Sequence, residues 1–235
     1  EFSEKLSKVG TQPLIGTQIN LRFNNVVGKI TLYATSKHGY NNLTKLSSLS
    51  YLKNKETEEP SCDFNDLISN SKDLILLTGN YYNFFGKLFY ANKIKDFEKI
   101  VISLKSSFKD RLYFEIQRHG ENEEKNYENY LLNTSKILDI ALIATQEVFY
   151  MKSDMYEAHD ALICIGEKSF VDDKNRFKYS NQHYFKKDED LQKLYSDIPE
   201  ALENNYNFHL RFNYKPKKSK PILPTIANEQ NNSPE

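Results

Sequence analysis

Short apolar runs alternate with amphipathic helical stretches from residue 63 onward, and this alternation restricts the fold more than any other feature of the sequence. The runs cover residues 74–77, 112–116 and 140–144, and they are typical of strands buried on both faces. Between them, residues 94–108 and 127–138 carry apolar side chains at the three- and four-residue spacing of a helix. Because strands and helices that alternate in this way form βαβ units, the sequence predicts an α/β fold with a mostly parallel sheet.

The first part of the chain predicts a different pair of strands. Residues 13–23 and 29–34 have strand character, and Asn24, Asn25 and Gly28 mark the turn between them. The gap is too short for a crossover helix, so these two strands are expected to be antiparallel.

Helices are predicted on either side of this strand pair. Residues 1–9 have the pattern of a helix that ends at Gly10, and residues 40–52 form another helix after a turn at 36–39. Asp63 is a plausible N-cap for a short helix, and Cys62 before it is expected in a loop.

The pattern changes towards the C-terminus. Residues 161–165 form an apolar run that predicts a helix covering the strand at 140–144. Beyond residue 165 the chain is polar and irregular, and short helices are predicted at 188–195 and again from residue 198.

The composition limits the class of protein. Lys+Arg and Asp+Glu both number 32, so the net charge is zero and gives no overall electrostatic argument for binding nucleic acid or a membrane surface. No apolar run approaches the ~18 residues of a membrane span. The two cysteines, Cys62 and Cys164, are too few for a disulfide scaffold and indicate a reducing, cytoplasmic setting.

Polar residues follow the predicted parallel strands at the edge where ligands bind in α/β proteins. Glu147 follows the run at 140–144, and Glu115, Gln117 and His119 alternate along the strand that begins at residue 112. His159 lies near the start of the next helix. These four residues, Glu115, Gln117, His119 and His159, could form the wall of a polar pocket, or they could simply be hydrogen-bonded and solvated residues at the ends of the elements.

No local metal-binding motif is present. No two of the five histidines lie within four residues of each other, and no HxH, HExxH or Cys/His cluster occurs. Motifs for a nucleophile elbow, a P-loop or a dinucleotide site are also absent from the sequence. Only a metal site assembled from distant residues is therefore left open.

Several segments, in order along nearly the whole chain, resemble the PHP (polymerase and histidinol phosphatase) domain family in the form found in the alpha subunit of bacterial DNA polymerase III. The second half carries the closest likeness. The similar segments are PLIG at 13–16, GYNNL at 39–43, YFEIQRHG at 113–120, residues 144–165 and SDIPEAL at 196–202.

The resemblance implies an incomplete, distorted (β/α)7 PHP-type barrel with a C-terminal helical extension. The family's opening His-x-His strand, with about two β/α units or roughly 60 residues, and the palm, fingers and thumb are expected to lie outside this sequence. The expected segments are a truncated PHP barrel at 1–185, a helical exit segment leading towards the palm at 186–214, and a Lys- and Pro-rich linker with a disordered tail at 215–235.

The family's metal pocket can be followed position by position. Matching its motifs places Gln18 where the family has Glu, Lys29 where it has His, and Asn80 where it has Cys. Its Asp and His of the N-D-V-H motif are matched by Glu147 and Phe149. An amide is a poor metal ligand and an ammonium repels a cation, so the resemblance implies a decayed pocket with no catalytic and no metal-binding residues. Lys29 is hypothesised to pair with Glu147.

The resemblance implies a non-catalytic part of a replicative polymerase subunit, which supports the polymerase body and docks the proofreading exonuclease subunit. No cofactor is expected for this chain, whereas the parent polymerase would use Mg, and contact with DNA would occur only through the parent. Two alternatives stay open. One is a residual metal-dependent phosphoesterase or 3′–5′ exonuclease with bound Zn or Mn, and the other is a gene remnant without a function of its own.

Overall fold

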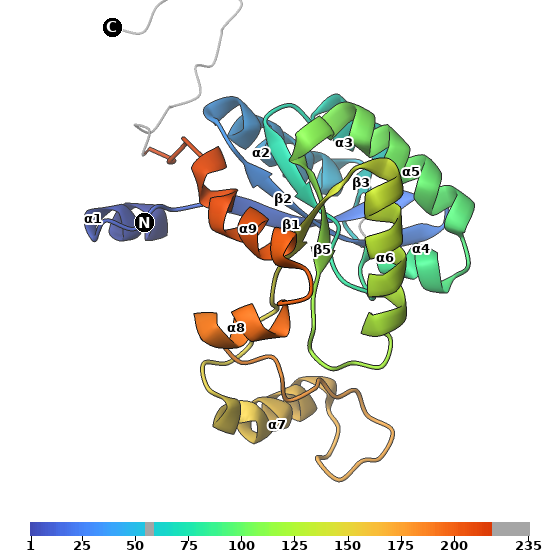
Figure 1. The fold of residues 1–235 in the computed structure, drawn as a ribbon, viewed down its shortest axis with the longest axis vertical. Helices are drawn as coiled ribbons and strands as arrows, with labels where there is room; N and C mark the ends of the chain where they lie inside the picture. Colours follow the sequence, from blue (N-terminus) through green and yellow to red (C-terminus); the bar gives the residue numbers. More distant parts are fainter. Residues whose placement is uncertain (55–58, 218–235) are drawn as a thin grey trace, which may run out of the picture.

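The computed structural model describes residues 1–54 and 59–217, and its strands form one sheet flanked by helices (Figure 1). The predicted linker and tail at 215–235 fall mostly outside the described residues. The strands are β1 (Ile15–Phe23), β2 (Val26–Ala34), β3 (Cys62–Asp63), β4 (Leu74–Leu77), β5 (Leu112–Ile116) and β6 (Ala141–Ala144). The helices are α1 (Phe2–Lys8), α2 (Lys37–Leu52), α3 (Phe64–Ser69), α4 (Phe84–Tyr90), α5 (Ile94–Phe108), α6 (Glu124–Leu138), α7 (Tyr156–Glu167), α8 (Asp188–Leu194) and α9 (Pro199–Phe208), with 3₁₀ turns η1 (Lys109–Arg111), η2 (Ser153–Met155) and η3 (His209–Arg211).

The sheet has the order β3-β1-β2-β4-β5-β6. Strand β2 is antiparallel to both β1 and β4, while β1 is parallel to β3 and the series β4, β5 and β6 is parallel throughout. Among the strands that the structure describes, only β2 therefore runs against the common direction, which confirms the mostly parallel α/β fold and the antiparallel first pair. The barrel-like arrangement is open, because β3 and β6 end the sheet without pairing to each other.

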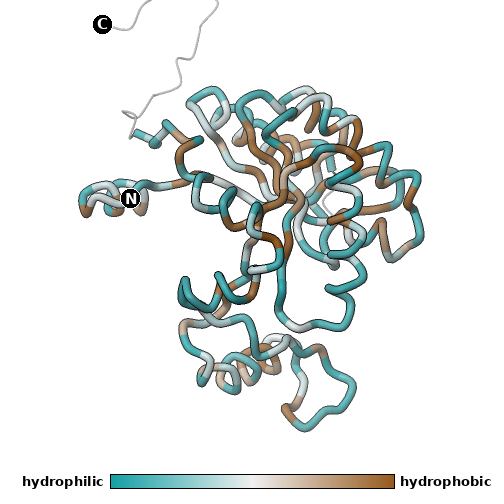
Figure 2. The backbone as a smooth tube through the Cα atoms, viewed as in Figure 1, coloured by the Kyte–Doolittle hydropathy of each residue, from teal (hydrophilic) through white to brown (hydrophobic). Residues whose placement is uncertain are grey.

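Alternate residues of the central strands enter two separate cores. Leu74 and Leu76 of β4 face a large core that α2, α4, α5 and α6 cover, whereas Ile75 and Leu77 face a smaller core completed by Phe208 of α9. Hydrophobic stretches accordingly concentrate in the sheet and in the helices against it (Figure 2). The strands are buried on both faces, as their unbroken apolar sequences predicted.

The predicted partner of β6 is wrong. The apolar run at 161–165 lies in α7, but this helix sits in a lobe that projects from the sheet (Figure 1), and Leu162 and Ile165 are 63% and 75% exposed. Helix α9 packs against β6 instead. An apolar run in a helix does not by itself identify the surface that the run contacts, and here Leu162 and Ile165 stay exposed.

Gly28 and the residues after it also depart from the expectations. The turn between β1 and β2 consists of Asn24 and Asn25 alone, and Gly28 lies within β2, where an added Cβ would be 2.6 Å from the Cα of Phe84. Glycine at this position therefore permits the close approach of α4, a helix that the sequence did not predict. Helix α2 begins at Lys37 inside the expected turn, because the side chain of Ser36 caps it by accepting a hydrogen bond from the Gly39 N–H at 3.1 Å.

Cys62 lies in a strand rather than in the expected loop. It pairs with Leu21 of β1 as part of the two-residue strand β3, and its thiol is buried, which raises its pKa to about 12. Among the described residues, none of the helices combines the length and the hydrophobicity needed to cross a bilayer.

Candidate functional site

The ends of β4, β5 and β6 are joined by a buried polar network around Glu115. The Glu115 carboxylate accepts hydrogen bonds from the Gly79 N–H at 2.9 Å, from the Gln117 side chain at 3.0 Å and from the Thr145 hydroxyl. The Thr78 hydroxyl in turn accepts the Glu115 N–H at 3.1 Å. The carboxylate of Glu115 therefore ties three strands together at the edge where ligands bind in other α/β proteins.

The electrostatics of Glu115 follow from this burial. Removal from water raises the pKa of the Glu115 carboxyl group, and the hydrogen bonds from Thr145, Gln117 and Gly79 act in the opposite direction because they favour the charged form. Its two oxygen atoms are already occupied by protein donors. With hydrogen bonds to both oxygen atoms, Glu115 has the contacts of a structural carboxylate.

Asn80 belongs to the same network. Its side-chain N–H donates to Gln117 Oε1 at 3.0 Å, and its Oδ1 accepts the Tyr82 N–H at 3.2 Å. Asn80 is 4% exposed, and its amide donates one hydrogen bond and accepts one inside the protein.

Glu147 has a different partner from the one hypothesised. The hydroxyl of Tyr82 donates to its carboxylate, and no ion pair with Lys29 is found among the described residues. Burial raises the pKa of the Glu147 carboxyl group. The positive charge of Lys29, which is exposed on β2, lowers this pKa and so opposes the effect of burial. The predicted salt bridge is therefore wrong, because a tyrosine supplies the hydrogen bond that a lysine was expected to give.

Four aromatic rings form a continuous column beside Glu147. His119 stacks on His183 with 4.0 Å between ring centroids, Phe149 follows His183 at 4.9 Å, and His159 follows Phe149 at 5.3 Å. The interplanar angles are 2°, 20° and 6°. The column connects the end of β5 with α7, so Phe149 serves as a packing residue between two histidines.

Hydrogen bonds fix the tautomer of His119. The backbone N–H of Glu147 donates to His119 Nε2 at 3.2 Å, so Nε2 carries the lone pair. Nδ1 must then hold the proton, which it directs at Glu124 Oε1, 3.1 Å away. The Glu124 carboxylate also accepts the backbone N–H groups of His119, Gly120 and Glu121 at 2.8, 2.9 and 3.2 Å.

His183 is held in its neutral form. Its Nδ1–H donates to the Glu147 carbonyl at 3.0 Å, and its Nε2 has no hydrogen-bond partner among the described residues. The side chain is 2% exposed. Burial, with a further contribution from neighbouring His119, lowers the pKa of His183 to about 4.

The residues that match the family's metal pocket do not fit a metal cluster. Gln18 and Lys29 are exposed on β1 and β2, and Gln18 donates to Thr31 Oγ1 at 3.4 Å. The Asn80 amide is hydrogen-bonded to Gln117, and the Phe149 ring has no atom that could coordinate a metal ion. Within residues 1–54 and 59–217, no group of three or more His, Cys, Asp or Glu side chains is placed to hold an ion.

The predicted polar wall separates into two groups. Glu115 and Gln117 bond to each other as their alternation predicted, but β5 ends at Ile116, so His119 turns away to Glu124 and joins the ring column with His159. Sequence reasoning missed Tyr82, His183 and Glu124. His183 lies in an irregular polar segment with no periodic signal, and only its place in three dimensions reveals its contacts.

The chain is similar to known proteins along most of its length. The profile of the PHP domain family matches residues 1–119. DNA polymerase III subunit alpha of Caulobacter vibrioides (strain NA1000 / CB15N) is 34% identical over 239 residues, an alignment that covers 96% of this chain and 20% of the relative. The same subunit is 34% identical in Rickettsia bellii (strain RML369-C), with 97% and 20% covered, and 28% identical in Vibrio cholerae serotype O1 (strain ATCC 39315 / El Tor Inaba N16961), with 96% and 20% covered.

The chain spans about a fifth of the length of these curated relatives, and the aligned part is their PHP region. The family profile covers half of the chain, and the open α/β sheet with its helices agrees with a PHP-type fold. The chain belongs to the PHP domain family.

Proposed function

We propose that this chain is a non-catalytic PHP domain of a DNA polymerase III alpha-type protein, in which it supports the polymerase body and docks the proofreading exonuclease subunit. The observation that carries the proposal is the state of the pocket. Phe149 lies in a stacked ring column, Asn80 and Glu115 are hydrogen-bonded within the protein, and Lys29 adds a positive charge nearby. These contacts favour a structural role for the sheet edge. DNA synthesis and contact with DNA would belong to the parent protein.

Metal content tests the non-catalytic part of the proposal. After incubation with Zn²⁺ or Mn²⁺ and removal of free ions, elemental analysis is expected to find well below one ion per chain, because the positions that match the family's metal pocket contain no histidine and only one carboxylate, that of Glu147. No hydrolysis of a phosphomonoester or of single-stranded DNA is expected. Two or three bound ions per chain, together with phosphoesterase activity, would instead support the alternative of a residual metal-dependent phosphoesterase or 3′–5′ exonuclease.

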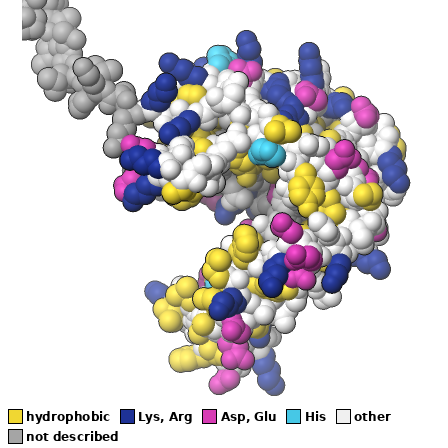
Figure 3. Space-filling view, turned by 60° about the vertical axis from the view of Figure 1, so that its left-hand side comes forward, with side chains coloured by type: hydrophobic (Ala, Val, Ile, Leu, Met, Phe, Trp, Pro, Cys, Tyr) yellow, Lys and Arg dark blue, Asp and Glu magenta, His cyan; other side chains and the backbone are white. Residues whose placement is uncertain are grey.

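The lobe around α7, residues 149–187, offers a surface for a protein partner. Large apolar side chains gather on this projecting lobe (Figure 3), and contiguous exposed apolar surface on a folded protein marks an interaction site. The lobe is attached through the ring column and through backbone hydrogen bonds between its two ends, with Phe149 N–H donating to His183 O at 2.9 Å and Phe185 N–H to Tyr150 O at 3.0 Å. Its exposed large apolar residues are Phe149, Met151, Met155, Leu162, Ile165, Phe170, Val171, Phe177 and Phe185.

Substitution on α7 tests the docking proposal. Ile165→Asp is expected to weaken binding of the exonuclease subunit about tenfold or more, because it places a charge in an apolar contact. Titration by biolayer interferometry measures this effect, with Ile137→Asp on α6 as the matched control, since Ile137 is 79% exposed and Ile165 is 75% exposed. If the wild-type chain does not bind the exonuclease subunit at all, the docking role fails and the gene-remnant alternative gains support.

A further inference from the structure

Strand β6 is an edge strand whose outer side faces away from β5. The Thr145 N–H donates to the Ile116 carbonyl at 3.0 Å, so residue 145 and, by alternation, residue 143 direct their backbone groups towards β5. The backbone groups of Leu142 and Ala144 therefore point to the open side. Unpaired groups in such a row form a template on which another strand can pair.

Two side chains of α9 occupy this open side. Asn204 Nδ2 donates to the Leu142 carbonyl at 2.8 Å, and Asn205 Nδ2 donates to the Ala144 carbonyl at 2.8 Å. A carboxamide has the same donor and acceptor groups as a peptide unit. The two asparagines thus supply the hydrogen bonds that a neighbouring strand would supply to the same carbonyl groups.

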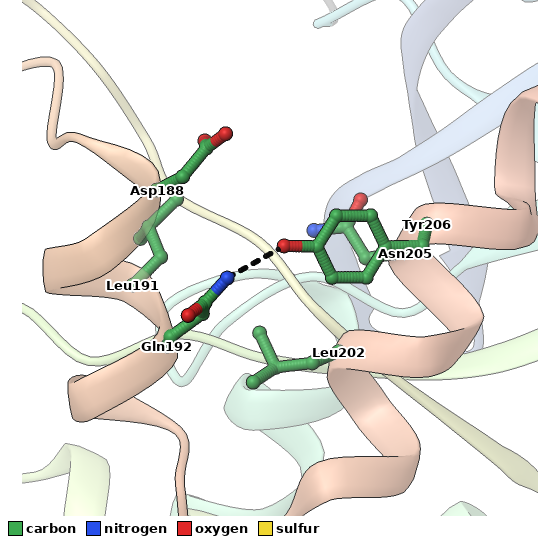
Figure 4. Close-up of a pocket in the computed structure, with 6 residues that line it drawn as sticks. All are labelled: Asp188, Leu191, Gln192, Leu202, Asn205 and Tyr206. Atoms are coloured by element: carbon green, nitrogen blue, oxygen red, sulfur yellow. Dashed lines mark hydrogen bonds between the residues drawn. The ribbon is translucent and has the colours of Figure 1, made fainter.

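Helix α9 is firmly held on the sheet side and loosely packed on the other. The Phe208 ring makes edge-to-face contacts with Tyr33 and Tyr113, with 5.4 and 5.9 Å between ring centroids, and Ala201 is fully buried. Towards α8 there is a cavity of about 160 Å³, crossed by a hydrogen bond from Gln192 Nε2 to Tyr206 Oη at 3.0 Å (Figure 4).

A second cavity continues the hollow towards the end of β6. Its volume is about 220 Å³, it reaches Ala144 and Thr145, and it shares Leu202 and Asn205 with the first. The α8 side of α9 is therefore hollowed by two adjoining cavities, while buried Ala201 and Phe208 and the two asparagine hydrogen bonds hold the helix over the sheet.

We propose that α9 is a cap for the open edge of the sheet, and that the uncovered β6 edge pairs with β6 of a second copy of this chain. The edge sequence is Ala-Leu-Ile-Ala, which is apolar and uncharged, the composition that favours strand pairing between chains. Two identical edges related by a two-fold axis pair as antiparallel strands. The opposite edge needs less protection, since β3 has only two residues.

The Asn204→Ala, Asn205→Ala double variant tests the cap. It is expected to strengthen self-association at least about tenfold over the wild type in sedimentation equilibrium. Asn207→Ala is the matched control, because Asn207 is exposed on the same helix, and this variant should behave as the wild type. Adding Ala144→Pro to the double variant should restore the monomer, since the Ala144 N–H faces outward and proline at this position removes a donor that edge pairing needs.

Hydrogen exchange distinguishes edge pairing from other association. In the associated double variant the Leu142 and Ala144 amides should be protected, and a dimer without this protection would overturn the proposal. A double variant that keeps the wild-type circular dichroism spectrum and stays monomeric would also overturn it. If the double variant does not fold, each single variant is measured instead. Each single variant should then self-associate more strongly than Asn207→Ala, and single variants that both stay as monomeric as this control would count against the cap.

Discussion

Glu115→Ala is expected to lower the free energy of unfolding by about 3 kcal/mol or more, since a buried group left without its partner costs roughly 1–3 kcal/mol. The substitution removes the acceptor for the Gly79 N–H, for the Gln117 amide and for the Thr145 hydroxyl at once. It also opens a cavity where three strands end, and the surrounding structure can fill such a space only in part. Urea denaturation at pH 7 measures the loss.

Two further variants locate the cause of this loss. Glu203→Ala, at an exposed position of α9, should stay within about 0.5 kcal/mol of the wild type. Glu115→Gln keeps the volume but turns an amide N–H₂ group towards donors, so an intermediate loss is expected. If Glu115→Ala costs less than about 1 kcal/mol, the carboxylate does not hold the strand ends together, and a role in binding would have to be reconsidered.

The parts of the fold that the sequence predicted are those whose signal is local. Strand β4 and helix α5 have an unbroken apolar run and a clear helical stripe, and each appears where its pattern placed it. The pairing of Glu115 with Gln117 also follows from alternation along one strand. In each case a short segment determines its own conformation, so distant residues are not needed for the prediction.

The wrong predictions share one cause: the sequence of a segment does not show which other segment it contacts. Helix α7 has the apolar run, but α9 covers β6 although its sequence is rich in polar residues. Phe208 packs in one core with Ile143 of β6, and two asparagines donate hydrogen bonds to carbonyl groups of the same strand. Lys29 and Glu147 have opposite charges, yet the Glu147 carboxylate accepts its hydrogen bond from the Tyr82 hydroxyl. Helix α4 was not predicted. Gly28 of β2 allows this helix to approach closely, but a single glycine in a strand does not indicate which segment packs against it.

A fall in pH from 6.5 to 4 is expected to remove up to about 3 kcal/mol of stability through His183 alone, at 1.36 kcal/mol per pKa unit. The pKa of His183 is about 4 in the folded chain and 6.5 in the ordinary, solvated state. Between these values the unfolded chain binds a proton that the folded chain does not, so acid favours unfolding. The stability is therefore complete above pH 6.5 and declines as the pH falls towards 4.

His183→Phe isolates this effect from other titrating groups. Phenylalanine keeps a ring between His119 and Phe149 but cannot be protonated, so it loses the hydrogen bond to the Glu147 carbonyl by an amount that does not depend on pH. The stability of the wild type minus that of the variant should be constant between pH 7 and 8 and should fall steadily below pH 6.5. The raised pKa values of Glu115 and Glu147 act in the opposite direction, because their protonation in acid favours the folded chain, and they cancel in this difference. A difference that stays flat down to pH 4.5 would mean that His183 accepts its proton without leaving the column, for example with the Glu121 carboxylate 4.0 Å from Nε2 as its counter-ion, and the neutral form of His183 would not be a constraint on the fold.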